Sequence, residues 1–399
     1  MFKGEGLSIR LLVINLGWEQ APLIDYLSAQ GGLELYGVHY NAKSYRPKVF
    51  KEILTTNLRD LGCITEFADK VRPEAVIADQ CDYSLFVQAM LAQRYGLPGP
   101  SLESAQFSNN KFLQRLRSRE EGLTIPEFEL CWTPVQVRVF AEQHGLPVII
   151  KPVDNRGSFG VVKINDVADI DAAFQQSLVH SHSRTLLVET FIHGVHITVD
   201  GYAFPKSGIK SLALATKVLD GPDSSVAVEI VYPGRLPEAM FRRALAVNEA
   251  VNHSLGYRFG MTHSEYMISN EEVYLIESAN RGGGVFTSAL IVPASSGVDL
   301  VRQYVADCLG ENIDLYQLPK HQSVVLRFFS FKSGRVQTIE GWESICADPR
   351  LLAQDLFVST GDVIQPITND ANRHGYIILR GTSEEANSLL QKVKVTYEG

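Results

Sequence analysis

The most informative stretch of the chain is "IIKPVDNRGSFGVVKI", which runs from Ile149 to Ile164. Two apolar, β-branched runs flank a loop rich in Gly, Ser and Asn, and this pattern predicts a β-hairpin with a flexible tip. Glycines in such a tip let backbone N–H groups come close to an anion. The loop is not a P-loop, which requires Gly, four residues and Gly-Lys-Ser/Thr ahead of a helix, because a second strand is expected here. We therefore hypothesise that Lys151 and the hairpin tip cover a phosphate group.

The bulk composition is that of a globular protein. The 399 residues are 45% hydrophobic and 21% charged, which is enough chain for two or three domains. The formal net charge of −8 argues against a general nucleic-acid binder, which would carry a basic surplus. The five cysteines are scattered and form no CxxC pair, so reduced thiols are expected rather than a disulfide framework.

The chain carries no obvious membrane signal. No apolar run approaches the roughly 18 residues of a spanning helix. The first residues, "MFKGEGLSIRLLVINLG", lack the long apolar region and cleavage site of a signal peptide. We expect a soluble, cytoplasmic protein whose partners are small molecules rather than membranes or nucleic acids. A homodimer is kept as a candidate assembly.

The first hundred residues alternate between strand and helix patterns. Strands are expected at 9–17, 34–40 and 74–80, and helices at 21–30, 51–72 and 82–95. This order predicts a small βαβ domain. No GxGxxG turn follows the first strand, so a dinucleotide site is not expected there.

The rest of the chain mixes both elements. A basic helix capped by Ser108 and a second helix precede the hairpin, and a third helix and the strand "RTLLVETFI" follow it. Further strands are expected at 196–204, 209–219, 260–269 and 272–279, with a helix at 237–256. The last ninety residues predict a helix at 299–309, several short strands and a closing helix at 383–394.

Four charged residues stand out in this pattern. Lys111 opens a helix, Lys151 lies on a strand beside the hairpin tip, and Glu265 and Glu277 lie on adjacent strands. Each of these residues alone is weak evidence for a binding site, because a strand Lys is usually solvated or half-buried and a "GSFG" tip is often a plain turn. Paired carboxylates on an exposed sheet face are equally ordinary. The order in which these four residues follow one another along the chain is far more specific than any one of them alone.

In that order, residues from Gln106 to Gly310 resemble the ATP-grasp superfamily. The resemblance implies an α/β and α+β protein with the ATP-grasp fold, a Rossmann-like βαβ domain before it and a β-rich lid segment after it. It implies an N-terminal domain at 1–105, an ATP-grasp domain at 106–310 with a small subdomain at about 125–195, and a C-terminal α/β segment at 311–399. ATP would lie between two subdomains with Mg²⁺, or Mn²⁺ in its place, on acidic residues.

The resemblance also gives roles to the hairpin. Lys111 and Lys151 look like the pair of ammonium groups that meets the α- and β-phosphates as mobile point charges. "DNRGSFGV" resembles the loop that closes over the phosphates, with N–H groups of Ser158, Phe159 and Gly160 in contact. Lys151 and its loop would then be two halves of one phosphate clamp.

The strand "VETFI" resembles the hinge that reads adenine. Glu189 would accept a hydrogen bond from the exocyclic amine, and the backbone of Thr190, Phe191 and Ile192 would meet the ring edge. The alternative is a buried strand with one edge carboxylate. Seven residues after Glu189, where the family usually has an acid for the ribose, this chain has His196, whose imidazole can also hydrogen-bond a diol.

Glu265 and Glu277 look like the Mg²⁺ ligands, because hard cations prefer carboxylate oxygens. Arg281 looks like the catalytic arginine, whose planar fork suits a transferred phosphoryl group or an acyl phosphate. The glycines after it, of which Gly283 and Gly284 are expected to bind substrate, would form a close-approach loop.

One departure from the sequence motif of the family points to a particular branch of that family. The usual Glu-x-Asn-x-Arg is "ESANR" here, with Ala279 in the Asn place and Asn280 one position late. Ala is familiar there in L-amino acid ligases, and the tail beginning "VVLRFFSFKSGRV" resembles the tail of those enzymes. The resemblance therefore implies an ATP-dependent carboxylate–amine ligase that forms an amide or peptide bond through an acyl phosphate, with an amino acid substrate and release of ADP and phosphate.

Other functions stay open. A biotin-carboxylase-like or purine-pathway ligase would depend on bicarbonate or on a phosphorylated ribose substrate. A non-catalytic ATP-binding module is the alternative from another class, favoured by Ala279 and His196 and opposed by the intact lysines, glutamates and Arg281. An ADP-release assay with pooled amino acids separates the three.

Glu229, in "SSVAVEIVYPGRLPE", is a further candidate. In amino acid ligases this region resembles a substrate wall, where a carboxylate would hold the α-ammonium of the activated amino acid. The alternative is an alternating strand on which Glu229 plays no part in binding. His39 and His263 lack metal-ligand spacing and are expected to be structural.

Overall fold

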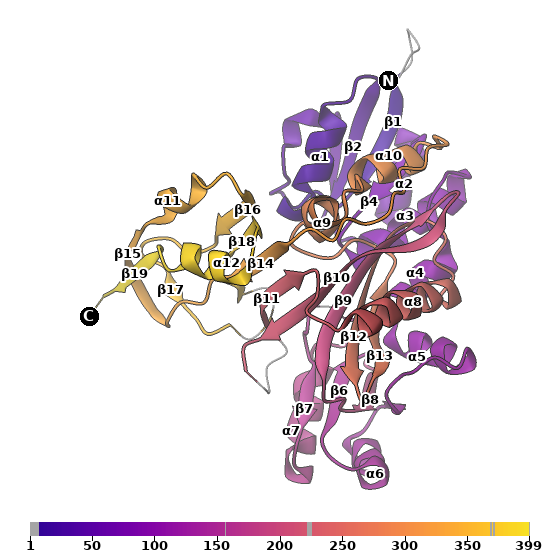
Figure 1. Ribbon diagram of the computed structural model, residues 1–399. Helices are drawn as coiled ribbons and strands as arrows, with labels where there is room; N and C mark the ends of the chain where they lie inside the picture. Colours follow the sequence, from indigo (N-terminus) through magenta and orange to yellow (C-terminus); the bar gives the residue numbers. More distant parts are fainter. Residues whose placement is uncertain (1–7, 156, 222–225, 368, 370–371, 399) are drawn as a thin grey trace.

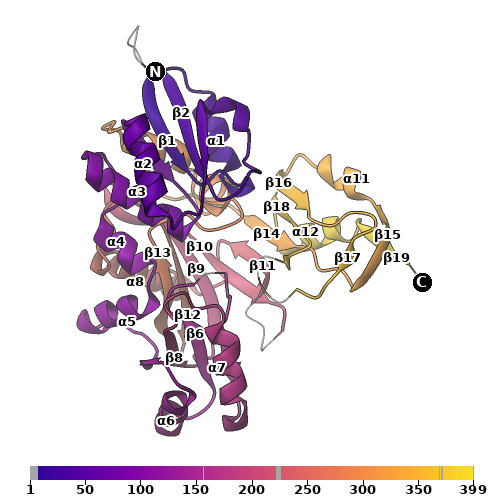
Figure 2. The ribbon, with the colours of Figure 1, turned by 180° about the vertical axis from the view of Figure 1, so that it is seen from behind.

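The computed structural model describes residues 8–155, 157–221, 226–367, 369 and 372–398. A long central sheet connects its parts (Figure 1). The N-terminal sheet and the small sheet of the hairpin lie at opposite ends of the molecule, and the C-terminal part projects to one side (Figures 1 and 2). The domain boundaries expected near residues 105 and 310 stay predictions.

The N-terminal part is the predicted βαβ domain. Its four strands are parallel and ordered β3-β2-β1-β4. The apolar strand β1 is buried from Leu11 to Ile14, as expected of a parallel strand covered on both faces. The elements are β1 Ile9–Ile14, α1 Ala21–Ser28, β2 Leu33–His39, β3 Glu52–Thr55, α2 Leu61–Val71, β4 Ala75–Ala78 and α3 Asp82–Tyr95.

Two helix starts differ from the sequence prediction. Residues 51–72 are not one helix, because Glu52–Thr55 pairs with β2 as strand β3 and α2 begins only after its cap Asp60. The basic helix α5, Lys111–Glu120, is capped by Asn110, whose Oδ1 accepts from two backbone N–H groups of the first turn. Ser108 instead ends the preceding helix α4, Leu102–Ser108. Both Ser and Asn are good caps, so composition alone did not separate them.

The small sheet contains the predicted hairpin. Strands β6 Val148–Pro152 and β7 Val162–Ile164 pair antiparallel, which confirms the hairpin; Arg156 in its tip lies outside the described residues. Helices α6 Pro134–His144 and α7 Ile170–Leu178 share one apolar cluster with β6 and β8, and so cover one face of the sheet. The sheet order is β5-β8-β6-β7, with β5 Phe128–Cys131 and β8 Leu186–Thr190.

The central sheet is antiparallel, with the order β13-β12-β9-β10-β11-β14-β18-β16. Helix α8, Glu238–Ser254, packs on Ile197 and Val199 of β9 and on Tyr266 of β12. Because side chains alternate along a strand, the residues between them face the other way, into the cavity described below. The strands are β9 Val195–Phe204, β10 Gly208–Leu219, β11 Ala227–Tyr232, β12 Gly260–Ser269, β13 Glu272–Ala279, β14 Val324–Phe328, β16 Leu351–Leu356 and β18 Gly375–Arg380.

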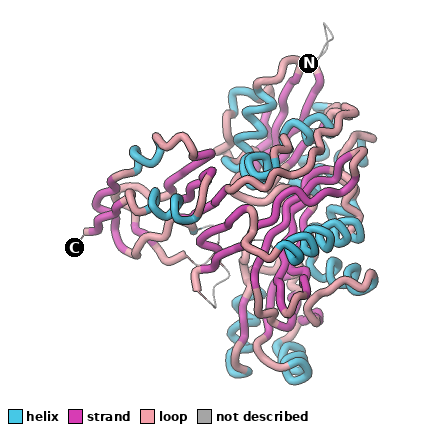
Figure 3. The backbone as a smooth tube through the Cα atoms, viewed as in Figure 1, coloured by secondary structure: helices cyan, strands magenta, loops and turns pink. Residues whose placement is uncertain are grey.

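Strands β14, β16 and β18 of the C-terminal part belong to the central sheet (Figure 3). A second, three-stranded sheet has the order β17-β15-β19, and the closing helix ends at Leu390 because Lys394 already begins β19. Within the described residues, no helix combines the length and the apolar character that crossing a membrane requires. The remaining elements are α9 Val292–Ser296, α10 Leu300–Cys308, β15 Gly334–Glu340, α11 Trp342–Cys346, β17 Val363–Ile364, α12 Ser383–Leu390 and β19 Lys394–Tyr397, with short helical turns η1 Trp18–Gln20, η2 Pro47–Val49, η3 Val167–Asp169 and η4 Thr287–Ile291.

Candidate active site

A cavity of about 1160 Å³ lies between the small sheet, the central sheet and the N- and C-terminal parts. Most of the residues predicted from the sequence line it, although they come from separate elements. These are Lys111, Lys151, Ser158, Phe159, Glu189, Thr190, Phe191, Ile192, His196, Glu265, Glu277, Arg281 and Gly284. Gly160, Gly283 and Glu229 are not among its lining residues.

Both predicted lysines point into this cavity from buried positions. Nζ of Lys111, at the start of α5, lies 2.9 Å from Oε1 of Glu277 and donates to the carbonyl of Asn155 at 2.5 Å. Nζ of Lys151, on β6, lies 2.6 Å from Oε2 of Glu189. Burial lowers the pKa of the Lys151 ammonium more than Glu189 raises it. Each ammonium is thus held by a carboxylate at the cavity wall.

Glu189 has a second cationic partner that the sequence did not suggest. Nε of Arg115 lies 2.6 Å from Glu189 Oε1, and Nη2 of Arg115 donates to the carbonyl of Ile276 at 2.7 Å. Burial raises the pKa of the Glu189 carboxyl, but Arg115 and Lys151 outweigh it and the net shift is downward. Arg115 follows Lys111 by four residues, which places both on one helix face. This spacing could have pointed to Arg115 as a residue of the site. The adenine contact of Glu189 stays a prediction.

The hairpin tip is built from left-handed backbone. Gly157, Ser158 and Gly160 have φ values of 61°, 60° and 74°, a conformation that glycine adopts without penalty and other residues rarely take. A Cβ on Gly160 would lie 2.9 Å from Cβ of His180 and 3.0 Å from the carbonyl oxygen of Ser177. Gly160 therefore allows close packing of the tip on α7, whereas Ser158 and Phe159 face the cavity.

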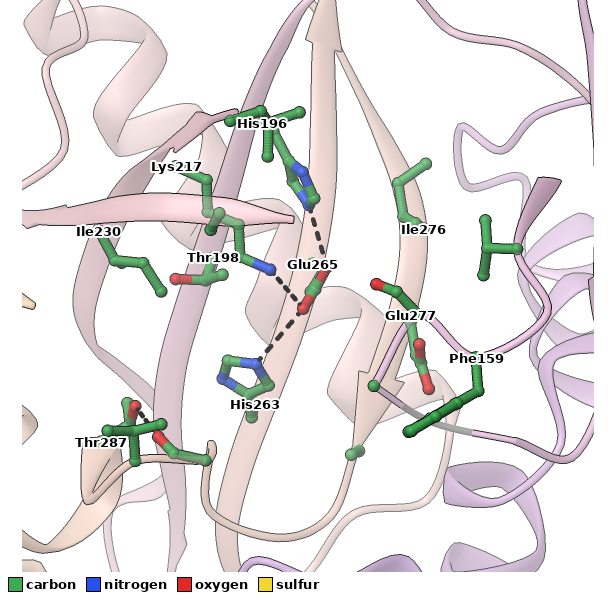
Figure 4. A pocket seen from close by; sticks show the side chains of 18 of the residues that line it. Phe159, His196, Thr198, Lys217, Ile230, His263, Glu265, Ile276, Glu277 and Thr287 are labelled. Carbon is green, nitrogen blue, oxygen red and sulfur yellow. Dashed lines mark hydrogen bonds and ion pairs between the residues drawn. The ribbon is translucent and has the colours of Figure 1, made fainter. Parts of the chain in front are cut away.

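The two predicted carboxylates are directly opposed on neighbouring strands. Glu265 of β12 is the register partner of Glu277 of β13. Figure 4 shows three basic side chains directed at Glu265: Nζ of Lys217 at 2.6 Å, Nε2 of His196 at 3.0 Å and Nε2 of His263 at 3.8 Å. Burial raises the pKa of the Glu265 carboxyl, but Lys217 and the two imidazoles hold it well below its usual range. Glu265 is therefore an anion at neutral pH.

His263 belongs to the cavity rather than to the core. Its Nδ1 lies 2.7 Å from Oδ1 of Asp200, whose Oδ2 accepts from the Tyr232 hydroxyl at 2.8 Å. Burial lowers the pKa of His263, but Asp200 and Glu265 raise it to about 9. His263 precedes Glu265 by two residues and therefore shares its strand face, a signal the sequence offered. His39, by contrast, accepts from the backbone N–H of Leu16 at 3.1 Å, as expected of a structural residue.

The donor set for a metal ion is two carboxylates. Among the described residues, no group of three or more His, Cys, Asp or Glu side chains has metal-binding geometry. Asn280 is not among the residues that line the cavity, and its Nδ2 donates to the carbonyls of Phe259 and Met261 at 2.8 and 3.0 Å, so it does not join this pair of carboxylates. Mg²⁺ usually takes one or two protein carboxylates and completes its shell with phosphates and water. Glu265 and Glu277 fit that requirement.

Arg281 is anchored to the N-terminal domain. Its Nε and Nη2 lie 2.6 and 3.1 Å from the two carboxylate oxygens of Asp82, and its Nη1 donates to the carbonyl of Gly282 at 2.9 Å. Asp79 accepts from the N–H of Gly282 at 3.1 Å. A Cβ on Gly283 would lie 2.8 Å from Nδ1 of His263, so this glycine permits a close approach although it does not line the cavity.

The structure corrects the expectation for Glu229. Ile230 and Tyr232 of β11 line the cavity, whereas Glu229 is buried on the other side of the strand as the register partner of Arg327. Val231, which shares its side, packs into the apolar cluster of the C-terminal part. Glu229 is thus not placed to contact a substrate in the cavity, although Ala227 at the start of the strand does line it.

Comparison with known proteins identifies the fold. Residues 144–289 match the ATP-grasp domain, and residues 327–397 match the L-amino acid ligase C-terminal domain 2. The L-amino acid ligase from Bacillus licheniformis superposes with a TM-score of 0.84 over 99% of this chain and 100% of that chain, at 18% identity. The chain has the ATP-grasp fold. The resemblance predicted from the sequence is confirmed.

Other ATP-grasp structures are also similar. Phosphoribosylglycinamide synthetase from Anaerococcus prevotii has a TM-score of 0.75 and 16% identity over 98% of this chain and all of that one. N5-carboxyaminoimidazole synthetase from Staphylococcus aureus, solved with ADP, has a TM-score of 0.72 and 13% identity over 98% of each chain. At these identities the likeness concerns the fold.

The relatives found by sequence comparison match this chain over only part of their own length. An uncharacterized protein, y4rH, from Sinorhizobium fredii is 24% identical over 307 residues, which are 76% of this chain and 63% of that protein. The D-alanine–D-alanine ligase of Anaeromyxobacter sp. is 27% identical over 161 residues, 39% of this chain and 50% of the ligase. The chain thus spans between half and two thirds of these curated relatives. Together the matches show that the chain is similar to ATP-grasp proteins, several of which are named as ligases or synthetases.

Proposed function

We propose that this ATP-grasp protein is an ATP-dependent ligase that joins a carboxylate to an amine through an acyl phosphate, with an amino acid as substrate. The observation that supports this most is that one cavity collects Lys111, Lys151, Glu265, Glu277 and Arg281. Its volume of about 1160 Å³ exceeds the roughly 300–1,000 Å³ of a site for one drug-sized ligand. A nucleotide and a further substrate can therefore share it.

The nucleotide would lie against the small sheet. Lys111 and Lys151 would balance the phosphate charge, and the N–H groups of the hairpin tip at Ser158 and Phe159 would add fixed donors. The backbone from Thr190 to Ile192 lines the cavity next to Glu189 and is the proposed adenine edge, with His196 toward the ribose. Mg²⁺, or Mn²⁺ in its place, would be held by Glu265 and Glu277 and would neutralise charge on the phosphates.

The chain's own part in the chemistry is to orient and to stabilise charge. An oxygen of the substrate carboxylate attacks the γ-phosphorus and the bond to ADP breaks. The amine then attacks the acyl carbon and loses a proton, the C–O bond to phosphate breaks, and an amide, phosphate and the released proton result. Arg281 would hold the phosphoryl oxygens with its guanidinium, since its fork is already fixed by Asp82. No side chain has to act as a nucleophile.

The match of residues 327–397 to an L-amino acid ligase domain favours amino acids over the substrates of the carboxylase and purine-pathway alternatives. The test is ADP release from ATP with pooled amino acids, with bicarbonate, or with a phosphoribosyl amine. We expect ADP only with amino acids, and one amide per ADP. Dependence on bicarbonate or on the phosphoribosyl amine, or nucleotide binding without turnover on any of them, would overturn the proposal.

A further inference from the structure

One end of the cavity is a wall of aromatic rings, here called the aromatic wall and made of Trp18, Phe357 and Tyr376. The ring of Trp18 stacks on Tyr376 with centroids 5.8 Å apart and meets Phe357 at 5.6 Å. Trp18 and Phe357 are each 43% exposed although they lie on a cavity surface. Exposed large aromatic side chains that gather in a cavity are a typical binding surface for apolar ligand groups.

The aromatic wall adjoins the loop that carries Arg281. Phe286, five residues after Arg281, meets Trp18 edge-on at 5.3 Å. Glu19, the neighbour of Trp18, accepts from the backbone N–H of Val285 at 3.0 Å. The wall comes from the N-terminal and C-terminal parts, whereas the phosphate clamp comes from the small sheet at the other end of the molecule (Figures 1 and 2). The loop that follows Arg281 therefore contacts the aromatic wall, and Arg281 itself lines the same cavity.

Charges of both signs border the aromatic wall. Glu19 and Asp355 contribute carboxylates to the cavity lining, and Arg373 contributes a guanidinium. The Arg373 guanidinium lies 3.5 Å from the ring centroid of Phe328 and donates to the carbonyl of Ala227 at 2.6 Å. A zwitterion with an apolar side chain complements this combination of rings, anions and cation.

We infer that the aromatic wall binds the side chain of an amino acid substrate and selects large apolar or aromatic ones. The inference rests on the proposed ligase function and narrows its substrate class. Trp18 and Phe357 are then specificity-determining residues, since they contact the side chain and not the reacting atoms. A small side chain would leave both rings in contact with water and would lose the free energy gained by burying them.

The test compares kcat/KM for L-phenylalanine and L-alanine in ADP release. The wild-type protein should favour phenylalanine, and Trp18→Ala and Phe357→Ala should each lower the phenylalanine-to-alanine ratio about tenfold or more. Trp132→Ala is the matched control, because this side chain is 56% exposed and does not line the cavity; it should keep the wild-type ratio.

The possible outcomes distinguish a failure of this inference from a failure of the proposed ligase function. A wild-type preference for alanine, or an unchanged ratio in both Trp18→Ala and Phe357→Ala, overturns the inference and leaves the ligase function standing. A wild-type protein that releases no ADP with any amino acid overturns the ligase function itself. A ratio that falls equally in Trp132→Ala also defeats the assignment to the aromatic wall.

Discussion

The guanidinium of Arg281 forms a bidentate ion pair with the carboxylate of Asp82, with N–O distances of 2.6 and 3.1 Å. The two residues are 199 positions apart, and Asp82 is the first residue of helix α3 in the N-terminal domain. Because a planar fork fits a carboxylate in one orientation, the pair fixes the direction of Arg281. A domain outside the ATP-grasp core thus orients the arginine proposed to act on phosphate.

Asp82→Asn is expected to lower kcat about tenfold or more and to change the ATP affinity little. The amide keeps the shape of Asp82 but loses the charge that aligns Arg281, which matters in the transition state more than in nucleotide binding. Asp69→Asn is the matched control, because Asp69 makes a similar two-pronged pair with Arg94 on the surface. An unchanged kcat, or ATP affinity that falls as far as kcat, would exclude the positioning role.

Lys151→Ala and Lys111→Ala are each expected to weaken nucleotide binding about tenfold to a hundredfold. A hydrogen bond to a charged group contributes roughly 1.5–3 kcal/mol, and both ammonium groups point into the cavity. Calorimetric titration with ATP measures the loss, with Lys48→Ala as control because Lys48 is exposed and away from the cavity. Wild-type affinity in a folded Lys151→Ala protein would show that the clamp is elsewhere.

Glu277→Gln is expected to abolish turnover while adenine recognition persists. The carboxamide preserves shape and removes the charge that Mg²⁺ prefers. Nucleotide titration with and without Mg²⁺ checks this, since the variant should lose the Mg²⁺-dependent part of the affinity. Turnover near the wild-type rate would move the metal role to Glu265 alone.

Local patterns in the sequence were enough to predict much of the fold. We could predict the hairpin around Lys151, the strands β9 and β12 and the apolar strand β1, because each shows a local pattern of apolar residues. The facing pair Glu265 and Glu277 could be placed on adjacent strands. Those features depend on near neighbours, and sequence patterns describe near neighbours well.

What could not be predicted depends on partners distant in the chain. Arg115 meets Glu189 across 74 residues, and Asp82 meets Arg281 across 199. The face on which Glu229 lies depends on strand register, because one residue of slip reverses every side chain. The aromatic wall joins Trp18 to Phe357 and Tyr376 only after the N-terminal and C-terminal parts of the molecule have come together.

Asp307 should give the stability of the protein a distinct pH dependence. Burial raises the pKa of this carboxyl from 3.8 to about 6, although it accepts from the Tyr202 hydroxyl at 2.6 Å and from Gln303 at 2.9 Å. The folded protein then binds this proton more tightly than the unfolded chain. The stability that protonation contributes is complete below the unfolded pKa and is lost as pH rises through about 6.

Urea unfolding of the wild type and Asp307→Asn across this range measures that effect. The wild-type free energy of unfolding, relative to the variant, should fall as pH rises from 3.8 to about 6 and level off above. A constant difference across the range would mean that Asp307 titrates normally.

The acyl phosphate is the central claim, and isotope transfer tests it most directly. The protein is given ATP, Mg²⁺ and amino acids whose carboxylate oxygens are 18O, and the released phosphate is examined by mass spectrometry. Because the attacking carboxylate oxygen leaves with the phosphoryl group, the account predicts one 18O in phosphate for every amide bond formed. Amide formation with unlabelled phosphate would contradict it.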